Sequence, residues 1–211
     1  MTQNTSHAVM AQRVEPIDSL DDFPSPPWSV RALCEQIIPK GYLGGSVLEP
    51  AANRGYLVKG LKDYFETIDG SDIHDYGAGF PVADFLQGKI SKEYDWKITN
   101  PPFNRAAEFV KRGCEVASFG VAVLVRASWL EGQKRYAGLF KINPPSIVAQ
   151  FVERVPMVKG RCDPKASTAT AYAWVVWIDG YHSTPRTDYR WIEPCRKKLE
   201  RPGDYDVLGV P

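Results

Sequence analysis

The stretch SVLEPAANRGYLVKGLKDYF, residues 46–65, decides the fold of this chain. Residues 46–48 form a short apolar run that ends abruptly in Glu49 and Pro50, as buried parallel strands do. A tight turn follows at residues 53–55, and apolar residues then recur at helical spacing over residues 56–65. The stretch therefore predicts a strand, a turn and a helix in immediate succession.

The same alternation continues on both sides of this unit. The pattern predicts helices over residues 28–38 and 105–118, and strands over residues 67–73, 82–86, 96–99 and 120–125. Strands that alternate with helices predict an α/β fold with a doubly wound, mainly parallel sheet. Two β-prone runs, residues 146–155 and 170–178, predict an antiparallel pair at the sheet edge. Residues 1–20 are predicted to be a flexible arm before a single domain of residues 21–211, whose tail beyond Gly180 shows no clear pattern.

Length and composition agree with one folded domain. The chain has 211 residues, of which 44% are hydrophobic, and a formal net charge of +1. These values argue against a disordered, fibrous or coiled-coil chain. The charge divides unevenly, however: residues 1–103 carry 9 Lys and Arg against 14 Asp and Glu, and residues 104–211 carry 17 against 11. Such asymmetry is a hint of nucleic-acid contact, although it also fits a solvated basic face.

Cysteine and histidine spacing argues against a metal site. The 4 cysteines form no C-x-x-C pair, and the 3 histidines are scattered. The first 20 residues have no apolar core with a basic start, and no later apolar run is long enough to span a membrane. We therefore expect a cytoplasmic protein with reduced thiols and without a metal or a membrane partner.

Four features fall at the predicted carboxyl ends of strands, which is where ligands bind in open α/β sheets. They are the loop of residues 49–55, Asp72, the pair Asp84 and Phe85, and the tetrapeptide Asn100-Pro101-Pro102-Phe103. Taken singly, the first three also fit ordinary loops. The tetrapeptide is harder to explain as structure, because two prolines directly after a strand remove two backbone donors and stiffen the turn.

This combination, together with Pro24-Ser25-Pro26-Pro27-Trp28, resembles the motifs of class I S-adenosylmethionine-dependent methyltransferases that act on amino groups. More narrowly, it resembles small phage and prophage adenine-specific DNA methyltransferases, whose signature is D/N-P-P-Y/F. The resemblance covers residues 21–125 and implies a Rossmann-like class I methyltransferase fold in a bacterial or phage-infected cell.

The resemblance also implies roles for individual residues. Ser25 and Pro26 would contact the methionine part of S-adenosylmethionine, and Asp72 would bind its ribose hydroxyls. Asp84 and Phe85 would hold its adenine. The loop that faces the cofactor would be shaped by Glu49, Ala51, Asn53 and Gly55. Family members usually have Gly where Asn53 stands and an acid where Tyr56 stands, which puts cofactor affinity in question.

The implied chemistry is transfer of a methyl group to the exocyclic amine of adenine in double-stranded DNA. Asn100, also next to the cofactor, and the carbonyl of Pro101 would each accept one amine hydrogen and so align the nitrogen lone pair for transfer. Pro102 stiffens the turn, and Phe103 would stack on a base flipped out of the duplex. The alternative for Phe103 is an ordinary core aromatic.

DNA contact would fall to basic residues after the tetrapeptide, in recognition loops near residues 127–145 and 159–169. The candidate residues are Lys134, Arg135, Lys141, Lys159, Arg161 and Lys165, with Trp129 and Tyr136 as candidate wedges. The acceptor could instead be an RNA base or a protein glutamine, and the chain could be a binding remnant without turnover. Either a monomer or a homodimer is compatible with the sequence.

Overall fold

A computed structural model describes residues 20–88 and 92–206, so the predicted arm lies outside the described residues except for Leu20. The helices of this part are α1 (Pro27–Gln36), η1 (Lys40–Tyr42), α2 (Tyr56–Leu61), α3 (Ala106–Val116), η2 (Ala127–Leu130), α4 (Gln133–Arg135), η3 (Tyr136–Phe140) and α5 (Arg196–Leu199). The strands are β1 (Ser46–Glu49), β2 (Thr67–Gly70), β3 (Tyr94–Thr99), β4 (Ala117–Arg126), β5 (Ile147–Phe151), β6 (Tyr172–Ile178) and β7 (Asp188–Ile192).

Within the described residues, seven strands form one sheet in the order β2-β1-β3-β4-β6-β5-β7. The first four are parallel neighbours, and β6 runs antiparallel to both β4 and β5. The predicted α/β fold and the predicted antiparallel pair are thus confirmed. The pair does not lie at the edge, because β7 from the unassigned tail adds a parallel strand outside β5.

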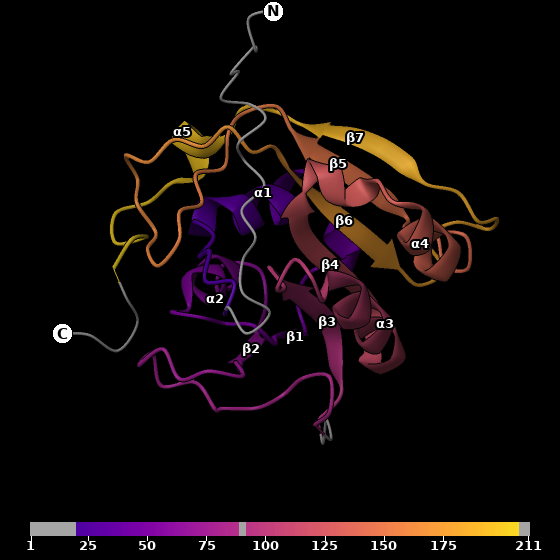
Figure 1. Ribbon diagram of the computed structural model, residues 1–211, viewed down its shortest axis with the longest axis horizontal. Coiled ribbons are helices and arrows are strands. Elements are labelled where there is room, and N and C mark those ends of the chain that lie inside the picture. Colours follow the sequence, from indigo (N-terminus) through magenta and orange to yellow (C-terminus); the bar gives the residue numbers. More distant parts are fainter. Residues whose placement is uncertain (1–19, 89–91, 207–211) are drawn as a thin grey trace, which may run out of the picture.

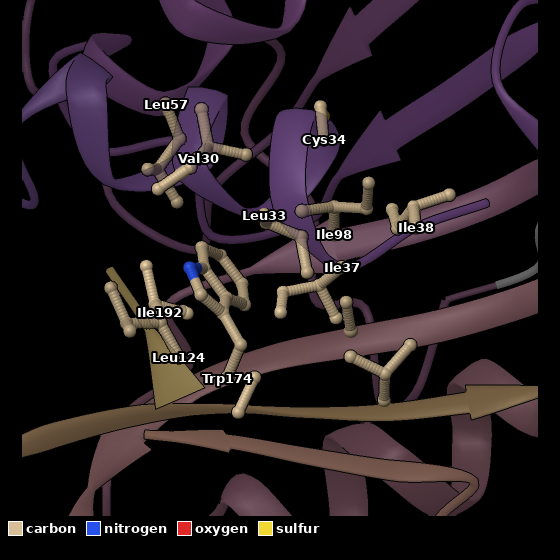
Figure 2. Close-up of a cluster of buried hydrophobic side chains, with 14 of the residues drawn as sticks. Val30, Leu33, Cys34, Ile37, Ile38, Leu57, Ile98, Leu124, Trp174 and Ile192 are labelled. Carbon is tan, nitrogen blue, oxygen red and sulfur yellow. The ribbon is translucent and has the colours of Figure 1, made fainter. Parts of the chain in front are cut away.

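Helices cover both faces of the sheet, with α1 and α2 on one side and α3 and α4 on the other (Figure 1). Strand side chains alternate between the two faces. Leu124 and Trp174 point towards α1, where they meet Val30 and Leu33, as Figure 2 shows. Val123 points to the opposite face, with α3 and η3. Each fully buried side chain of this size contributes about 1.5–3 kcal/mol to folding.

A buried ion pair attaches the C-terminal region to α1. The guanidinium of Arg31 donates two hydrogen bonds to Asp204, at 2.7 and 2.8 Å, and a third to Asp63 at 3.0 Å. Arg31 is 3% exposed, as is Asp204. Because the geometry is bidentate and both partners are buried, loss of either side chain leaves an unpaired buried charge.

The predicted strand over residues 82–86 is wrong. The structure has a single bridge between Asp72 and Val82, followed by a turn. The side chain of Asp84 accepts a hydrogen bond from the backbone N–H of Leu86, and its carbonyl accepts one from Gly88. An Asp that bonds its own following backbone favours a turn over a strand ladder. Asp84 and Phe85 therefore reach the site from a loop.

Candidate functional site

A cavity of about 250 Å³ opens at the carboxyl ends of β1 and β3. In the sheet, β2 lies on one side of β1 and β3 on the other, so the strand order reverses at β1. The cavity therefore lies at the switch point of the sheet, where α/β folds bind ligands. The predicted site residues on its wall are Ser25, Ala51, Asn53, Asp72, Asp84, Phe85, Asn100 and Pro102. Pro26, Glu49, Gly55, Pro101 and Phe103 adjoin wall residues in sequence without lining the cavity.

The loop after β1 has a defined hydrogen-bonded form. The carboxylate of Glu49, which is fully buried, accepts the backbone N–H of Ala51 at 3.0 Å. Burial raises the pKa of Glu49 to about 8, so this carboxyl group holds a proton at neutral pH. Asn53 and Gly55 both have positive φ, at 50° and 81°. Asn53 thus takes a left-handed conformation that Gly adopts most easily and that Asn tolerates better than most other residues.

Asp72 joins two backbone segments of the cavity wall. Its Oδ2 accepts the N–H of Asn53 at 2.9 Å, and its Oδ1 accepts the N–H of His74 at 3.0 Å. Burial raises the pKa of Asp72, while these two hydrogen bonds oppose the shift. Each carboxylate oxygen can accept a second hydrogen bond. The group is therefore suited to the hydroxyls of a sugar that enters the cavity.

Part of the cavity wall is apolar. Phe85 packs on Phe109 of α3 with ring centroids 5.2 Å apart, and Ile73 and Leu86 line the same cavity. A carboxylate next to apolar side chains is what a nucleoside requires, with acceptors for its sugar and a dry wall for its base. The cavity therefore fits the nucleoside part of S-adenosylmethionine.

Residues 20–25, which we call the strap, line part of the cavity, with the exception of Asp22. The backbone carbonyl of Phe23 accepts a hydrogen bond from Nδ2 of Asn100 at 2.8 Å, and Oδ2 of Asp21 accepts the N–H of Phe103 at 2.6 Å. The first bond fixes the orientation of the Asn100 amide. Its Oδ1 is buried and has no hydrogen-bond partner in the described residues. Because a buried acceptor without a partner is costly, Asn100 is suited to a donor other than those of residues 20–88 and 92–206.

The strap is also tied to the loop after β1. Asp22 accepts a hydrogen bond from Nδ2 of Asn53 at 2.8 Å and forms an ion pair with Arg54 at 2.8 Å. Arg54 in turn lies over the ring of Tyr76, 4.9 Å from its centroid. Asn53 therefore makes a contact that a glycine could not make. Its side chain adds a link between the strap and the cofactor loop.

Ser25 and Pro26 end the strap at the start of α1. Ser25 is 3% exposed and donates to the sulfur of Met157 at 3.5 Å, and Met157 also lies near Nδ2 of Asn100. Pro26 is the N-cap residue of α1, and its carbonyl accepts the hydroxyl of Ser29. Ser25 thus faces the cavity, whereas Pro26 shapes the backbone beside it.

Phe103 lies in an aromatic cluster next to the cavity. Its ring centroid is 6.0 Å from that of Phe23 and 6.4 Å from that of Tyr172. The guanidinium carbon of Arg126 lies 4.4 Å from the same centroid. Phe103 is partly buried against the main core, so the structure gives it a packing role whether or not it also contacts a base.

The basic residues divide into two groups. The backbone N–H of Gly160 donates to the carbonyl of Asp22 at 2.9 Å, which places the loop of residues 159–169 beside the strap. Its exposed Lys159, Arg161 and Lys165 are therefore near the cavity, with Arg161 paired to Asp163.

The second group lies along the α3 face of the sheet. Arg135 stacks on Trp129, its guanidinium donates to the carbonyls of Trp129 and Glu131, and burial lowers its pKa. Trp129 is 6% exposed and cannot act as a wedge, whereas Tyr136 is 59% exposed. Lys134 is exposed on α4.

Lys141 precedes Asn143, whose carbonyl accepts Trp177 Nε1 near the amino end of β4. This position is at the end of the sheet away from the cavity, so Lys141 is not brought to the site.

Sequence reasoning missed the residues that reach the site from far along the chain. These are Asp21, Asp22, Tyr76, Arg126 and Met157. Only the acidic pair before the prolines offered a signal. The others are isolated residues in loops or at a strand end, and periodicity does not mark them.

The described sheet, with helices on both faces and a cavity at its switch point, is the class I methyltransferase fold. No protein-family model matches the chain, and no curated protein matches it. Among solved structures, the chain resembles one from Listeria monocytogenes described as a "putative class I S-adenosylmethionine-dependent methyltransferase". The TM-score is 0.57 at 15% identity, over 79% of this chain and 64% of that one, so the chain spans less than two thirds of that relative.

Two further solved structures extend the comparison. The chain resembles a "putative hemolysin" from Lactococcus lactis with a TM-score of 0.50 at 9% identity, covering 78% of this chain and 90% of that one. It resembles the 23S rRNA methyltransferase ErmE with a TM-score of 0.47 at 16% identity, covering 72% and 67%. The likeness to the structures from Listeria monocytogenes and Lactococcus lactis establishes the fold alone.

Within residues 20–88 and 92–206, no helix is long and apolar enough to cross a membrane. No group of three or more His, Cys, Asp or Glu side chains there could hold a metal ion.

Proposed function

We propose that this chain is an S-adenosylmethionine-dependent methyltransferase that acts on the exocyclic amino group of adenine in DNA. The observation that carries the proposal is the buried Oδ1 of Asn100, an acceptor that has no hydrogen-bond partner in the described residues and belongs to a residue that lines the cavity. An aromatic amine is a weak nucleophile, because its lone pair is delocalised into the ring. A fixed acceptor for one amine hydrogen reorients that lone pair towards the attacked carbon.

The bound cofactor would supply an electrophilic methyl group. Asp72 would bind its ribose, Phe85 and Ile73 would flank its adenine, and Ser25 would lie beside its methionine part. Asn100 Oδ1 and the carbonyl of Pro101 would hold the two amine hydrogens of the acceptor. The strap keeps the Asn100 amide in the required orientation, because its Nδ2 is already bonded to Phe23.

Phe103 is proposed to contact the flipped base with the ring face that Arg126 leaves open. The loop of residues 159–169, which carries three exposed basic side chains, is proposed to contact phosphates, and residues 127–130 adjoin the same edge of the sheet. If these two loops alone read the DNA, the recognition site is expected to be short or loosely specified.

The first test incubates the full chain with methyl-labelled S-adenosylmethionine and unmethylated double-stranded DNA, followed by nucleoside analysis. We expect labelled N6-methyladenine. Labelled methylcytosine would refute adenine as the acceptor. Label found only in RNA or in a protein glutamine would refute DNA as the acceptor. If calorimetry detects no binding of S-adenosylhomocysteine, the chain is a remnant without turnover.

The second test asks whether Asn100 has the assigned role. Asn100→Ala should lower the methyl-transfer rate by about 100-fold or more, as does loss of a preorganised polar group in other active sites. It should change affinity for S-adenosylhomocysteine only slightly. The matched control is Asn143→Ala, an exposed Asn beside Cys114 at the far end of the sheet, which should retain full activity. Equal loss of transfer and of cofactor binding in Asn100→Ala would contradict the role.

A further inference from the structure

Arg126 is the last residue of β4 and lies directly beside the tetrapeptide. Its side chain points to the same face of the sheet as Leu124 and reaches the aromatic cluster. Its guanidinium carbon is 4.4 Å from the ring centroid of Phe103 and 5.7 Å from that of Phe23. Cation–π contacts of this kind contribute about 0.5–2 kcal/mol and hold the planar group in a fixed orientation.

The guanidinium of Arg126 forms a side-chain hydrogen bond with Tyr172. Arg54 and Arg105, the other arginines near the cavity, are paired with Asp22 and Glu108. In residues 20–88 and 92–206, no ion pair involves Arg126, and its buried Nε has no hydrogen-bond partner. Leaving a buried donor unsatisfied costs about 1–3 kcal/mol. An anionic oxygen from a ligand would remove that cost.

We propose that Arg126 binds a phosphate of the nucleic-acid acceptor, next to the nucleotide whose base Asn100 receives. This inference rests on the proposed function and names a residue that sequence reasoning did not single out. A guanidinium has five N–H donors whose paired groups match phosphate oxygens, so the hydrogen bond to Tyr172 leaves donors, Nε among them, for a ligand. A protein glutamine has no phosphate, so this contact selects nucleic acid over protein.

The experiment measures binding of a fluorescent DNA duplex, with S-adenosylhomocysteine present, over a series of salt concentrations. Arg126→Gln should weaken binding by about tenfold and make the slope of log affinity against log salt less steep by about 0.9, the effect of one lost phosphate contact. The matched control is Lys141→Gln, which removes one charge at the end of the sheet away from the cavity. It should leave both quantities unchanged.

Arg126→Lys separates charge from packing. It keeps the cation and loses the planar stack, so it should retain the wild-type salt slope while the methyl-transfer rate falls. A residue that only supported Phe103 would lower the unfolding temperature in both Arg126 variants and leave both slopes at the wild-type value, and that result would overturn the inference. Should Arg126→Gln fail to fold, the neutral variant Arg126→Met decides through its salt slope, because it keeps an unbranched apolar stem against Phe103 while the cation is lost.

The two proposals fail in different ways. If wild-type protein methylates DNA and Arg126→Gln has the wild-type slope, the phosphate contact is refuted and the proposed function stands. If wild-type protein binds S-adenosylhomocysteine and transfers methyl groups only to protein, the proposed function and the inference that rests on it are both refuted.

Discussion

Replacing Glu49 by Gln should change how the stability of this protein depends on pH. Glu49 lies fully buried at the end of β1, and burial raises its pKa from an ordinary 4.5 to about 8, with the Ala51 N–H opposing and the charge of Asp72 adding to the shift. Between these two values the folded chain holds one proton more than the unfolded chain. Stability from this group is therefore complete below pH 4.5 and is lost as the pH rises through 8.

The size of the effect follows from the proton count. One proton corresponds to about 1.4 kcal/mol per pH unit, so wild-type protein should lose about 2 kcal/mol relative to Glu49→Gln between about pH 6 and about pH 7.5. For a chain of this length that difference shifts the midpoint of thermal unfolding by about 4–8 °C. Gln keeps a carbonyl oxygen for the Ala51 N–H, so we expect affinity for S-adenosylhomocysteine to change little.

Urea unfolding of wild type, Glu49→Gln and the exposed control Glu66→Gln over that pH range measures the effect. The free energies of wild type and Glu66→Gln should fall together, while that of Glu49→Gln falls less. Parallel curves for wild type and Glu49→Gln would refute the reasoning, because they would mean that Glu49 binds no extra proton in the folded state.

Three further changes test individual contacts, one in the cofactor loop and two elsewhere in the fold. Asn53→Ala should lower stability by about 1–2 kcal/mol in thermal unfolding, because its φ of 50° strains Ala and the bond to Asp22 is lost, whereas Asn53→Gly should cost less. Asp204→Ala should cost about 3–5 kcal/mol in urea unfolding, since it leaves the buried Arg31 without its main partner; an unchanged midpoint would contradict the ion pair. Gly120→Ala should cost about 1–3 kcal/mol, because the new Cβ would lie 2.4 Å from a carbonyl oxygen of β6, and wild-type stability would disprove this close approach.

The sequence was informative wherever the signal was local. The unit of residues 46–65 has its strand, its turn and the first part of its helix where the pattern predicts them. The prediction of a strand at residues 82–86 was wrong. The apolar content there suggested a strand, but the side chain of Asp84 directs the backbone into a turn. Sequence reasoning also missed β7, because Tyr189 and Trp191 face solvent and only Ile192 is buried.

In the candidate site, too, residues with a local sequence signal could be predicted and long-range contacts could not. The tetrapeptide and Asp72 could be found from their positions after strands, and both lie at the cavity. The contacts that orient them could not, since Phe23 and Asp21 reach Asn100 and Phe103 across 77 and 82 residues. Such contacts depend on the packing of the whole domain and leave no periodic trace in the sequence.

The strap has a consequence for the thermodynamics of ligand binding. It holds the cofactor loop through Asp22, the tetrapeptide through Asp21 and Phe23, and residues 159–169 through Gly160. A ligand that tightens the strap at one of these places alters the free energy of ordering it at the others. Cofactor and acceptor should therefore change each other's affinity by one common factor, a reciprocity that linkage requires and that two titrations in opposite order would measure.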